Sequence, residues 1–243
     1  MEPQDLKQEL TEELIESASE ADLEITKEMM GFGLMYGHKK SKTNPKFKKY
    51  IFTTRNGIEI IDLTQTLSAL EPAIEFFKNK INNKGLILMV ASQPAAREAV
   101  EKLAEKFNFA YINDRWIGGT LTNFRVISQR IEYFKKAQLG LEKGEFDKYT
   151  KKERLMISRD IQRMEKMFSG LKNLTKLPDA IFMIDSSLKG HATAVREAKI
   201  MKIPIIAILD NDDNPEIADY LIPANDHSKM SIDWIVNRIA DRL

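Results

Sequence analysis

The chain of 243 residues contains no cysteine. This absence excludes disulfide bonds, thiolate metal ligands and catalysis by a thiol. Long apolar runs are also missing: the longest, residues 85–91 and 203–209, are far shorter than the roughly 20 residues that a membrane-spanning helix needs. The chain begins with an acidic stretch and lacks a basic start followed by an apolar block, so we expect no secretory signal. These absences predict a cytoplasmic protein without a membrane partner.

The glycine-rich loops that bind nucleotides are absent too. Neither G-x-G-x-x-G nor G-x-x-x-x-G-K-[ST] occurs. His191 could act as a base beside Ser187, but no oxyanion or nucleophile-elbow pattern accompanies the pair. We therefore expect no enzyme, no cofactor and no small-molecule substrate. The alternative is a sugar-phosphate-binding or isomerase-like enzyme on an α/β scaffold, with a pocket lined by Asp185, Ser187, His191 and Asp210.

The net charge is only +1, but the charges are sorted along the chain. Residues 1–30 hold ten acids and two lysines, and their leucines and isoleucines have a helical spacing. This acidic arm could be a helix that docks on a basic protein, but charge runs usually face water, which favours a solvated or loosely docked arm. Residues 31–58 hold seven cations and no acid. Such blocks imply different partners for different faces of the protein.

Hydrophobic spacing predicts an α/β domain. Leu67, Leu70, Ile74, Phe77 and Ile81 recur every three or four positions, as in an amphipathic helix. Buried strands are predicted at residues 85–91, 109–112, 180–185, 203–210 and 220–222, and helices alternate with them at 95–107, 192–201 and 232–239. This alternation predicts a parallel sheet with right-handed crossovers. The discontinuous domain would comprise residues 31–124 and 173–243.

Residues 125–172 interrupt this domain. Two stretches of heptad-like spacing, separated by Gly140 and Gly144, predict an antiparallel coiled-coil hairpin of two helices. Thirteen lysines and arginines against seven acids give the hairpin a basic surface.

The basic segment begins after Gly31. Three glycines between residues 31 and 37, followed by Asn44 and Pro45, predict an irregular loop. Its lysines alternate with Tyr36, Phe47 and Tyr50, a pattern typical of surfaces for phosphates and stacked bases. A basic loop could also serve solubility alone, but cations without any carboxylate nearby argue against it. The Arg55-Asn56-Gly57 sequence then predicts a tight turn between two strands.

A second candidate segment runs through residues 113–124. Gly118 and Gly119 allow a sharp turn or a close approach to another surface. Arg115 and Trp116 offer a cation and a flat face for nucleic acid. By residue type alone, a buried Trp116 and a structural Arg115 are the commoner arrangement.

Acidic residues follow two of the predicted strands. Asp185 follows one strand and the acidic turn 210–214 follows another, where carboxylates could hold magnesium. Short polar side chains also build turns and caps there, and we expect no metal site. His38 has no second histidine or carboxylate at ligand spacing nearby, so we expect it to pack or to contact a phosphate.

Together these stretches resemble the S-two family of bacterial small-subunit ribosomal proteins. The motifs, in family order, are Gly-His, Asn-Pro-Lys and Tyr-Ile-Phe within residues 37–52, Arg-Asn-Gly-Ile-x-Ile-Ile-Asp-Leu (55–63), Arg-Trp-Ile-Gly-Gly-Thr-Leu-Thr-Asn-Phe (115–124), Thr-Lys-Lys-Glu (150–153), Leu-Pro-Asp-Ala-Ile-Phe-Met-Ile-Asp (177–185), Ile-Pro-Ile-Ile-Ala-Ile-Leu-Asp (203–210) and Ile-Pro-Ala-Asn-Asp (222–226). The chain departs from the usual pattern at Thr43, where the family has an aromatic residue, at Lys40 and Lys42, which replace arginines, and in the turn after Asp210.

The resemblance implies a flavodoxin-like sheet with an inserted coiled-coil hairpin, bound to the ribosome through small-subunit rRNA. It also implies neighbouring ribosomal proteins as partners, including the large S-one protein that gathers messenger RNA. We expect the RNA contacts at Lys39, Lys40, Lys42, Asn44, Lys46, Lys48, Lys49, Arg55, Asn56, Arg115, Trp116, Asn123 and Arg125. A third hypothesis is an adaptor in which the acidic arm and the hairpin dock proteins and RNA contact is secondary.

Overall fold

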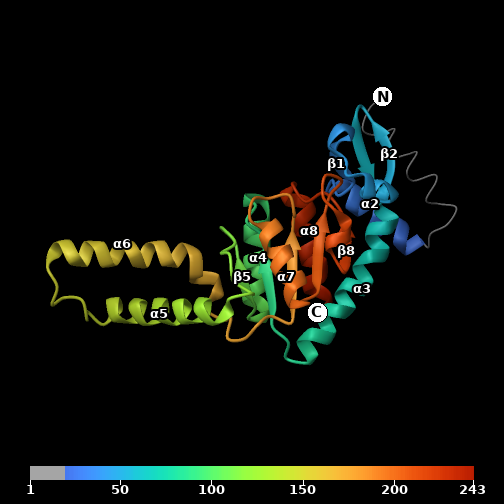
Figure 1. Ribbon diagram of the computed structural model, residues 1–243. Coiled ribbons are helices and arrows are strands. Elements are labelled where there is room, and N and C mark those ends of the chain that lie inside the picture. Colours follow the sequence, from blue (N-terminus) through green and yellow to red (C-terminus); the bar gives the residue numbers. More distant parts are fainter. Residues whose placement is uncertain (1–19) are drawn as a thin grey trace. The chain divides into compact units, whose positions relative to one another are not determined.

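The computed structural model describes residues 20–243 (Figure 1). The first nineteen residues of the predicted acidic arm therefore lie outside the described residues. The remainder of the arm forms the helix α2 (Glu20–Gly31). Met29 and Met30 near its end are 0% and 4% exposed, so this end of the arm packs against the protein.

A small antiparallel sheet follows α2. It consists of β1 (Tyr36–Lys39), β2 (Ile51–Arg55) and β3 (Ile58–Ile61), in the order β1-β3-β2. The turn between β2 and β3 has positive φ at both central residues, 49° at Asn56 and 77° at Gly57, as a two-residue type I′ turn requires. The predicted tight turn is therefore confirmed.

The prediction of an irregular loop after Gly31 was wrong where β1 forms. This strand pairs with β3 through Tyr36 with Ile60 and Lys39 with Ile58. Gly37 does not break the strand, because its missing side chain permits a close approach: a Cβ there would lie 2.5 Å from the side-chain oxygen of Asn211.

The main sheet has five strands in the order β5-β4-β6-β7-β8. Their bounds are β4 (Ile87–Val90), β5 (Ala110–Ile112), β6 (Ala180–Ile184), β7 (Ile205–Leu209) and β8 (Tyr220–Pro223). β4 pairs in parallel with β5 and β6, and β7 pairs in parallel with β8. Numbered along the chain, the order is 2-1-3-4-5, that of the flavodoxin-like fold. Every residue of β4, β6 and β7 is buried, as in a parallel sheet covered on both faces.

Four helices accompany this sheet: α3 (Leu63–Asn82), α4 (Pro94–Phe107), α7 (His191–Met201) and α8 (Lys229–Arg242). In α3, the residues at helical spacing, Leu70, Ile74 and Phe77, are at most 2% exposed, as the amphipathic pattern predicted. The α/β class and the flavodoxin-like arrangement inferred from the sequence are thus confirmed.

The insertion consists of α5 (Phe124–Glu142) and α6 (Lys151–Phe168), which run side by side in Figure 1. The ring of Phe134 lies 6.4 Å from that of Phe168, and Gln138 bonds to Glu165 at 3.5 Å, so the helices are antiparallel. A capping box of Thr150 and Glu153 starts α6. The two predicted helices are therefore present.

The chain divides into two compact units. The first takes its described residues from Met1–Lys78, Ile184–Ser186 and Ile206–Leu243. The second consists of Asn79–Met183 and Ser187–Ile205, and it contains the hairpin. Among the described residues, no helix is long and apolar enough to cross a membrane.

Candidate nucleic-acid interface

The lysine-rich segment, residues 39–49 of the first unit, is folded into two short 3-10 helices, Lys40–Lys42 and Pro45–Tyr50. Asn44 begins the second of them, since its side-chain oxygen accepts a hydrogen bond from the amide of Lys46 at 3.1 Å. Phe47 is fully buried and anchors the segment. The six lysines are all exposed: Lys39, Lys40, Lys42, Lys46, Lys48 and Lys49. One apolar anchor thus holds the backbone while the amines face outward.

The buried side chain of Asn211, just after β7, fastens this segment to the sheet. Its amide nitrogen donates to the hydroxyl of Thr43 at 2.7 Å and to the carbonyl of His38 at 3.2 Å. Its side-chain oxygen accepts from the amide of His38, and its carbonyl accepts from the amide of Asn44 at 2.7 Å. The lysine-rich segment is therefore held at both of its 3-10 helices.

Two of the six lysines have charge or ring partners in the first unit. Lys46 forms an ion pair with Glu216, with both side chains more than half exposed. Lys49 lies over the ring of Tyr50, 4.9 Å from its centre. An exposed ion pair is worth at most about 1 kcal/mol, so a polyanion can displace Glu216 from Lys46. The lysine-rich segment therefore keeps a positive surface.

The β2–β3 turn presents the next two predicted residues. Asn56 is exposed at the tip of the turn, and Arg55 at the end of β2 is half-buried. Both belong to the first unit, as do the six lysines.

The second predicted segment, residues 115–125, belongs to the second unit and is organised by Glu197 of α7. Its carboxylate accepts hydrogen bonds from the indole of Trp116 at 3.1 Å and from the amides of Gly119 at 2.8 Å, Leu121 at 3.0 Å and Thr122 at 3.2 Å. The hydroxyl of Thr122 adds a fifth, at 3.2 Å. Burial by itself raises the pKa of Glu197, but these donors outweigh it and hold the pKa below its ordinary value.

Trp116 is 3% exposed. The expectation that its indole offers a face to an unstacked base is therefore wrong, because the ring is covered and its N–H is bonded to Glu197. The commoner arrangement, a tryptophan in the core, applies here.

The other predicted residues of the second segment are exposed. Arg115 lines a pocket of about 550 Å³ together with Lys189, Gly118, Gly190 and Thr193, beside the start of α7. Two cations and the positive end of a helix make this pocket favourable for an anion. Asn123 and Arg125, at the start of α5, are also exposed.

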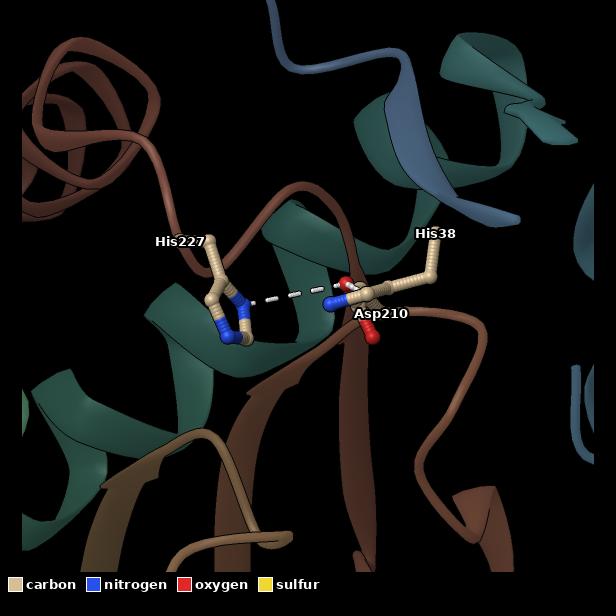
Figure 2. Close-up of side chains that lie close together, drawn as sticks. All are labelled: His38, Asp210 and His227. Carbon is tan, nitrogen blue, oxygen red and sulfur yellow. Dashed lines mark hydrogen bonds and ion pairs between the residues drawn. The ribbon is translucent and has the colours of Figure 1, made fainter. Parts of the chain in front are cut away.

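Sequence reasoning missed Glu197 and the carboxylates beside His38. A signal for Glu197 existed, since it occupies the face of α7 on which Ala194 and Ala198 are buried. His191 is 1% exposed with its Nε2 atom 2.9 Å from the hydroxyl of Ser92, so it is a core residue and not an accessible base. His38 has carboxylates close by, contributed by a segment more than 170 residues away, among them that of Asp210 (Figure 2).

Comparison with known proteins agrees with the motifs. The model of the family described as ribosomal protein S2 matches residues 29–243. The chain is 40% identical over 220 residues to the small ribosomal subunit protein uS2 of Thermus thermophilus, covering 90% of this chain and 85% of that protein. It is also 40% identical over 217 residues to the uS2 protein of Petrotoga mobilis, covering 89% of this chain and 75% of the other. The chain therefore belongs to the ribosomal protein S2 family.

Proposed function

We propose that the chain binds small-subunit rRNA through its lysine-rich segment. The observation that carries this proposal is that six exposed lysines lie within eleven residues without an acid, on a backbone anchored by Phe47 and Asn211. The family provides the coarser function: the chain is a structural, non-enzymatic constituent of the small ribosomal subunit. As a component of the ribosome it acts in the cytoplasm.

The chemistry of the segment favours contact with the phosphate backbone over reading of bases. Lysine acts as a point charge and lacks the planar fork with which arginine grips a guanine edge or a phosphate. Phosphate contacts position a protein on nucleic acid without reading its sequence. The fold of the ribosomal RNA, and not a short sequence, would then define the binding site.

The pre-formed backbone also supports binding. A loose loop pays conformational entropy when a ligand orders it, whereas the lysine-rich segment already has its turns capped by Asn44 and bonded to Asn211. Only the lysine side chains remain to be ordered.

The second unit supplies further cations for the same polyanion. Arg115 and Lys189 line the pocket beside α7, and Arg125 starts a hairpin with thirteen lysines and arginines against seven acids over residues 125–172. We propose that Arg115, Asn123 and Arg125 contact phosphates or sugars, with Arg55 and Asn56 doing so from the first unit. Trp116 is left out of this set because it is buried.

We further propose that the chain contacts neighbouring small-subunit proteins, including the S-one protein. The hairpin supports protein contacts, because large apolar side chains are exposed along it: Val126, Tyr133, Leu139, Leu141, Tyr149, Leu155, Met156 and Met167. The S-one proposal rests on the family resemblance, and the acidic residues 1–30 are the stretch tested as its docking segment.

The rRNA proposal is tested by filter binding of the full chain to small-subunit rRNA over a series of salt concentrations. Each duplex phosphate neutralised steepens the fall of log K with log salt by about 0.9, so four to six contacts give a slope of about −4 to −5. An affinity that stays flat between about 50 and 300 mM salt would contradict an electrostatic role for the lysine-rich segment.

The S-one proposal is tested by deleting residues 1–30 from the chain. In a sedimentation assay with small subunits, we expect the truncated chain to bind rRNA as before and to recruit less S-one protein. Unchanged recruitment of the S-one protein would show that the acidic arm does not dock it. Loss of rRNA binding would instead show that the arm is needed for folding, since the end of α2 packs against the protein through Met29.

A further inference from the structure

A pocket of about 420 Å³ lies in the second unit, before the amino ends of β4, β5 and β6. Its walls come from residues 81–86 at the end of α3, 107–109 at the end of α4, and 172–176 after the hairpin. None of the RNA contacts proposed above lines it. Its volume falls within the range of roughly 300 to 1,000 Å³ that is typical of small-molecule sites.

One wall of the pocket is apolar and aromatic. The rings of Phe107 and Phe109 stack with their centres 5.8 Å apart. Phe109 is buried, and the half-buried Phe107 lines the pocket together with Ile81 and Leu86. The exposed amine of Lys106 lies over the ring of Phe107, a weak contact that a flat ligand can displace. Aromatic side chains of this kind stack on nucleotide bases of any sequence.

Three lysines line the same pocket: Lys84, Lys172 and Lys176. None of the described residues that line it is acidic. Lys176 pairs with Asp179 at 2.9 Å, and its hydrogen bond holds the pKa of Asp179 below its ordinary value. Among residues 20–243, neither Lys84 nor Lys172 forms an ion pair. Two of the three amines are therefore available to an anion.

Two amide side chains complete the pocket. Asn173 donates a hydrogen bond to the side-chain oxygen of Asn108 at 2.7 Å, and both residues are exposed. The amide nitrogen of Asn108 can still donate, and the amide oxygen of Asn173 can still accept. The edge of a nucleotide base offers the same combination of donors and acceptors.

Lysines near helix ends also complement the helix dipole, and Lys84 follows the end of α3. This role does not explain Lys176, which lies in the segment before β6, or the aromatic wall beside the amines. The ends of α3 and α4 carry about half a negative charge each, so together with Asp179 they do not cancel three lysines. The pocket remains positive.

We propose that this pocket binds one nucleotide, with its base stacked on Phe107 and its phosphate held by Lys84, Lys172 and Lys176. An apolar wall beside several amines fits a molecule that joins a flat ring to an anion, whereas a simple anion would leave the wall unused. The nucleotide can be free or part of a single-stranded RNA segment, since both present the same base and phosphate. The site is separate from the lysine-rich segment, which belongs to the first unit.

The test follows binding of ATP to the full chain, free of RNA, by calorimetry. We expect one saturable site per chain with a dissociation constant between about 1 µM and 1 mM, as for a ligand of this size in an open pocket. Inorganic triphosphate, which lacks the base, should bind at least about fivefold more weakly. The absence of saturable ATP binding, or equal affinity for the two ligands, would overturn the proposal.

A double variant tests the amines. We expect Lys84→Gln with Lys172→Gln to weaken ATP binding at least about tenfold, because both contacts to the phosphates are charge-assisted. The matched control is Lys166→Gln with Lys199→Gln, which removes the same charge from exposed positions of the second unit outside the pocket. Equal losses of affinity in the two variants would contradict the pocket.

The variant Phe107→Leu tests the aromatic wall. It keeps an apolar side chain but removes the ring, so ATP binding should weaken at least about fivefold while the affinity for inorganic triphosphate stays the same. An unchanged affinity for ATP would rule out stacking on Phe107 and with it the proposal.

A single-stranded oligonucleotide of six adenylates distinguishes the two sources of the nucleotide. If the affinity that the double lysine variant loses is greater for the oligonucleotide than for ATP, the source is RNA. If it is greater for ATP, the source is a free nucleotide. A peptide of six glutamates represents an acidic protein partner. Displacement of ATP by this peptide at equal concentration would overturn the nucleotide proposal in favour of a protein.

Photochemical labelling covers variants that fail to fold. Irradiation of the native chain with 8-azido-ATP should label peptides that contain residues 81–86, 107–109 or 172–176, and excess ATP should suppress the label. Label confined to residues 39–49 would contradict the pocket. Because the label is located by mass spectrometry, failure of this proposal is distinguishable from failure of rRNA binding by the lysine-rich segment.

Discussion

We expect Glu197→Ala to lower the free energy of unfolding by about 3 to 5 kcal/mol, among the larger effects that a single substitution has. The substitution leaves five donors of Trp116, Gly119, Leu121 and Thr122 without their acceptor. The cost is high because the donors of Trp116 and Leu121 are buried, where water cannot replace the lost acceptor. Urea unfolding followed by circular dichroism measures the effect.

The neighbouring substitution Arg196→Ala is the matched control, because Arg196 is exposed on the same helix. We expect it to change the unfolding free energy by less than about 0.5 kcal/mol. An equally small loss for Glu197→Ala would show that the segment 115–125 does not depend on this carboxylate.

The stability that Glu197 contributes should decrease at acid pH. Glu197 has a folded-state pKa below its ordinary value of 4.5, so it contributes stability that is complete above pH 4.5 and is lost as the pH falls through the folded pKa. The difference in unfolding free energy between the native chain and Glu197→Gln should therefore be constant from about pH 7 to pH 5 and shrink below pH 4.5. A difference that grew toward acid pH would contradict this assignment.

Regular elements were predictable from the sequence because their signals are local. The spacing of apolar residues in α3, the continuous apolar runs of β4 and β7, and the Asn56-Gly57 pair each depend on residues close in the chain. β1 was missed because its formation depends on pairing with β3 and on the close approach of Gly37 to Asn211. No sequence pattern within residues 31–50 indicates those contacts.

The sites were predictable only in part. Exposed lysines were found from charge alone, since cations without acids rarely enter a core. The burial of Trp116 was not decidable from residue type, because its partner Glu197 lies 81 residues further along the chain. His38 and Asp210 are 172 residues apart, so ligand spacing along the sequence could not reveal their contact. The rule that parallel strands end at a common edge did point to Asp185 and Asp210.

We expect glutamine at all six lysines of the segment to weaken binding to small-subunit rRNA at least about a hundredfold at about 0.1 M salt, since each lost duplex contact costs up to about eightfold there. The salt slope should become shallower by up to about 5. Glutamine keeps most of the side-chain length and removes only the charge, while Asn44 and Phe47 continue to hold the backbone.

The control carries the same change of charge at six exposed lysines elsewhere: Lys27, Lys78, Lys102, Lys106, Lys199 and Lys229. If binding depended only on the net charge of the protein, both variants would bind RNA equally weakly, because the net charge falls by the same amount in each. If the lysine-rich segment binds the phosphates, the affinity for RNA should fall in the first variant alone. Equal losses of affinity in the two variants would therefore attribute the binding to the net charge of the protein. A salt slope that becomes shallower only in the first variant would attribute the binding to the lysine-rich segment.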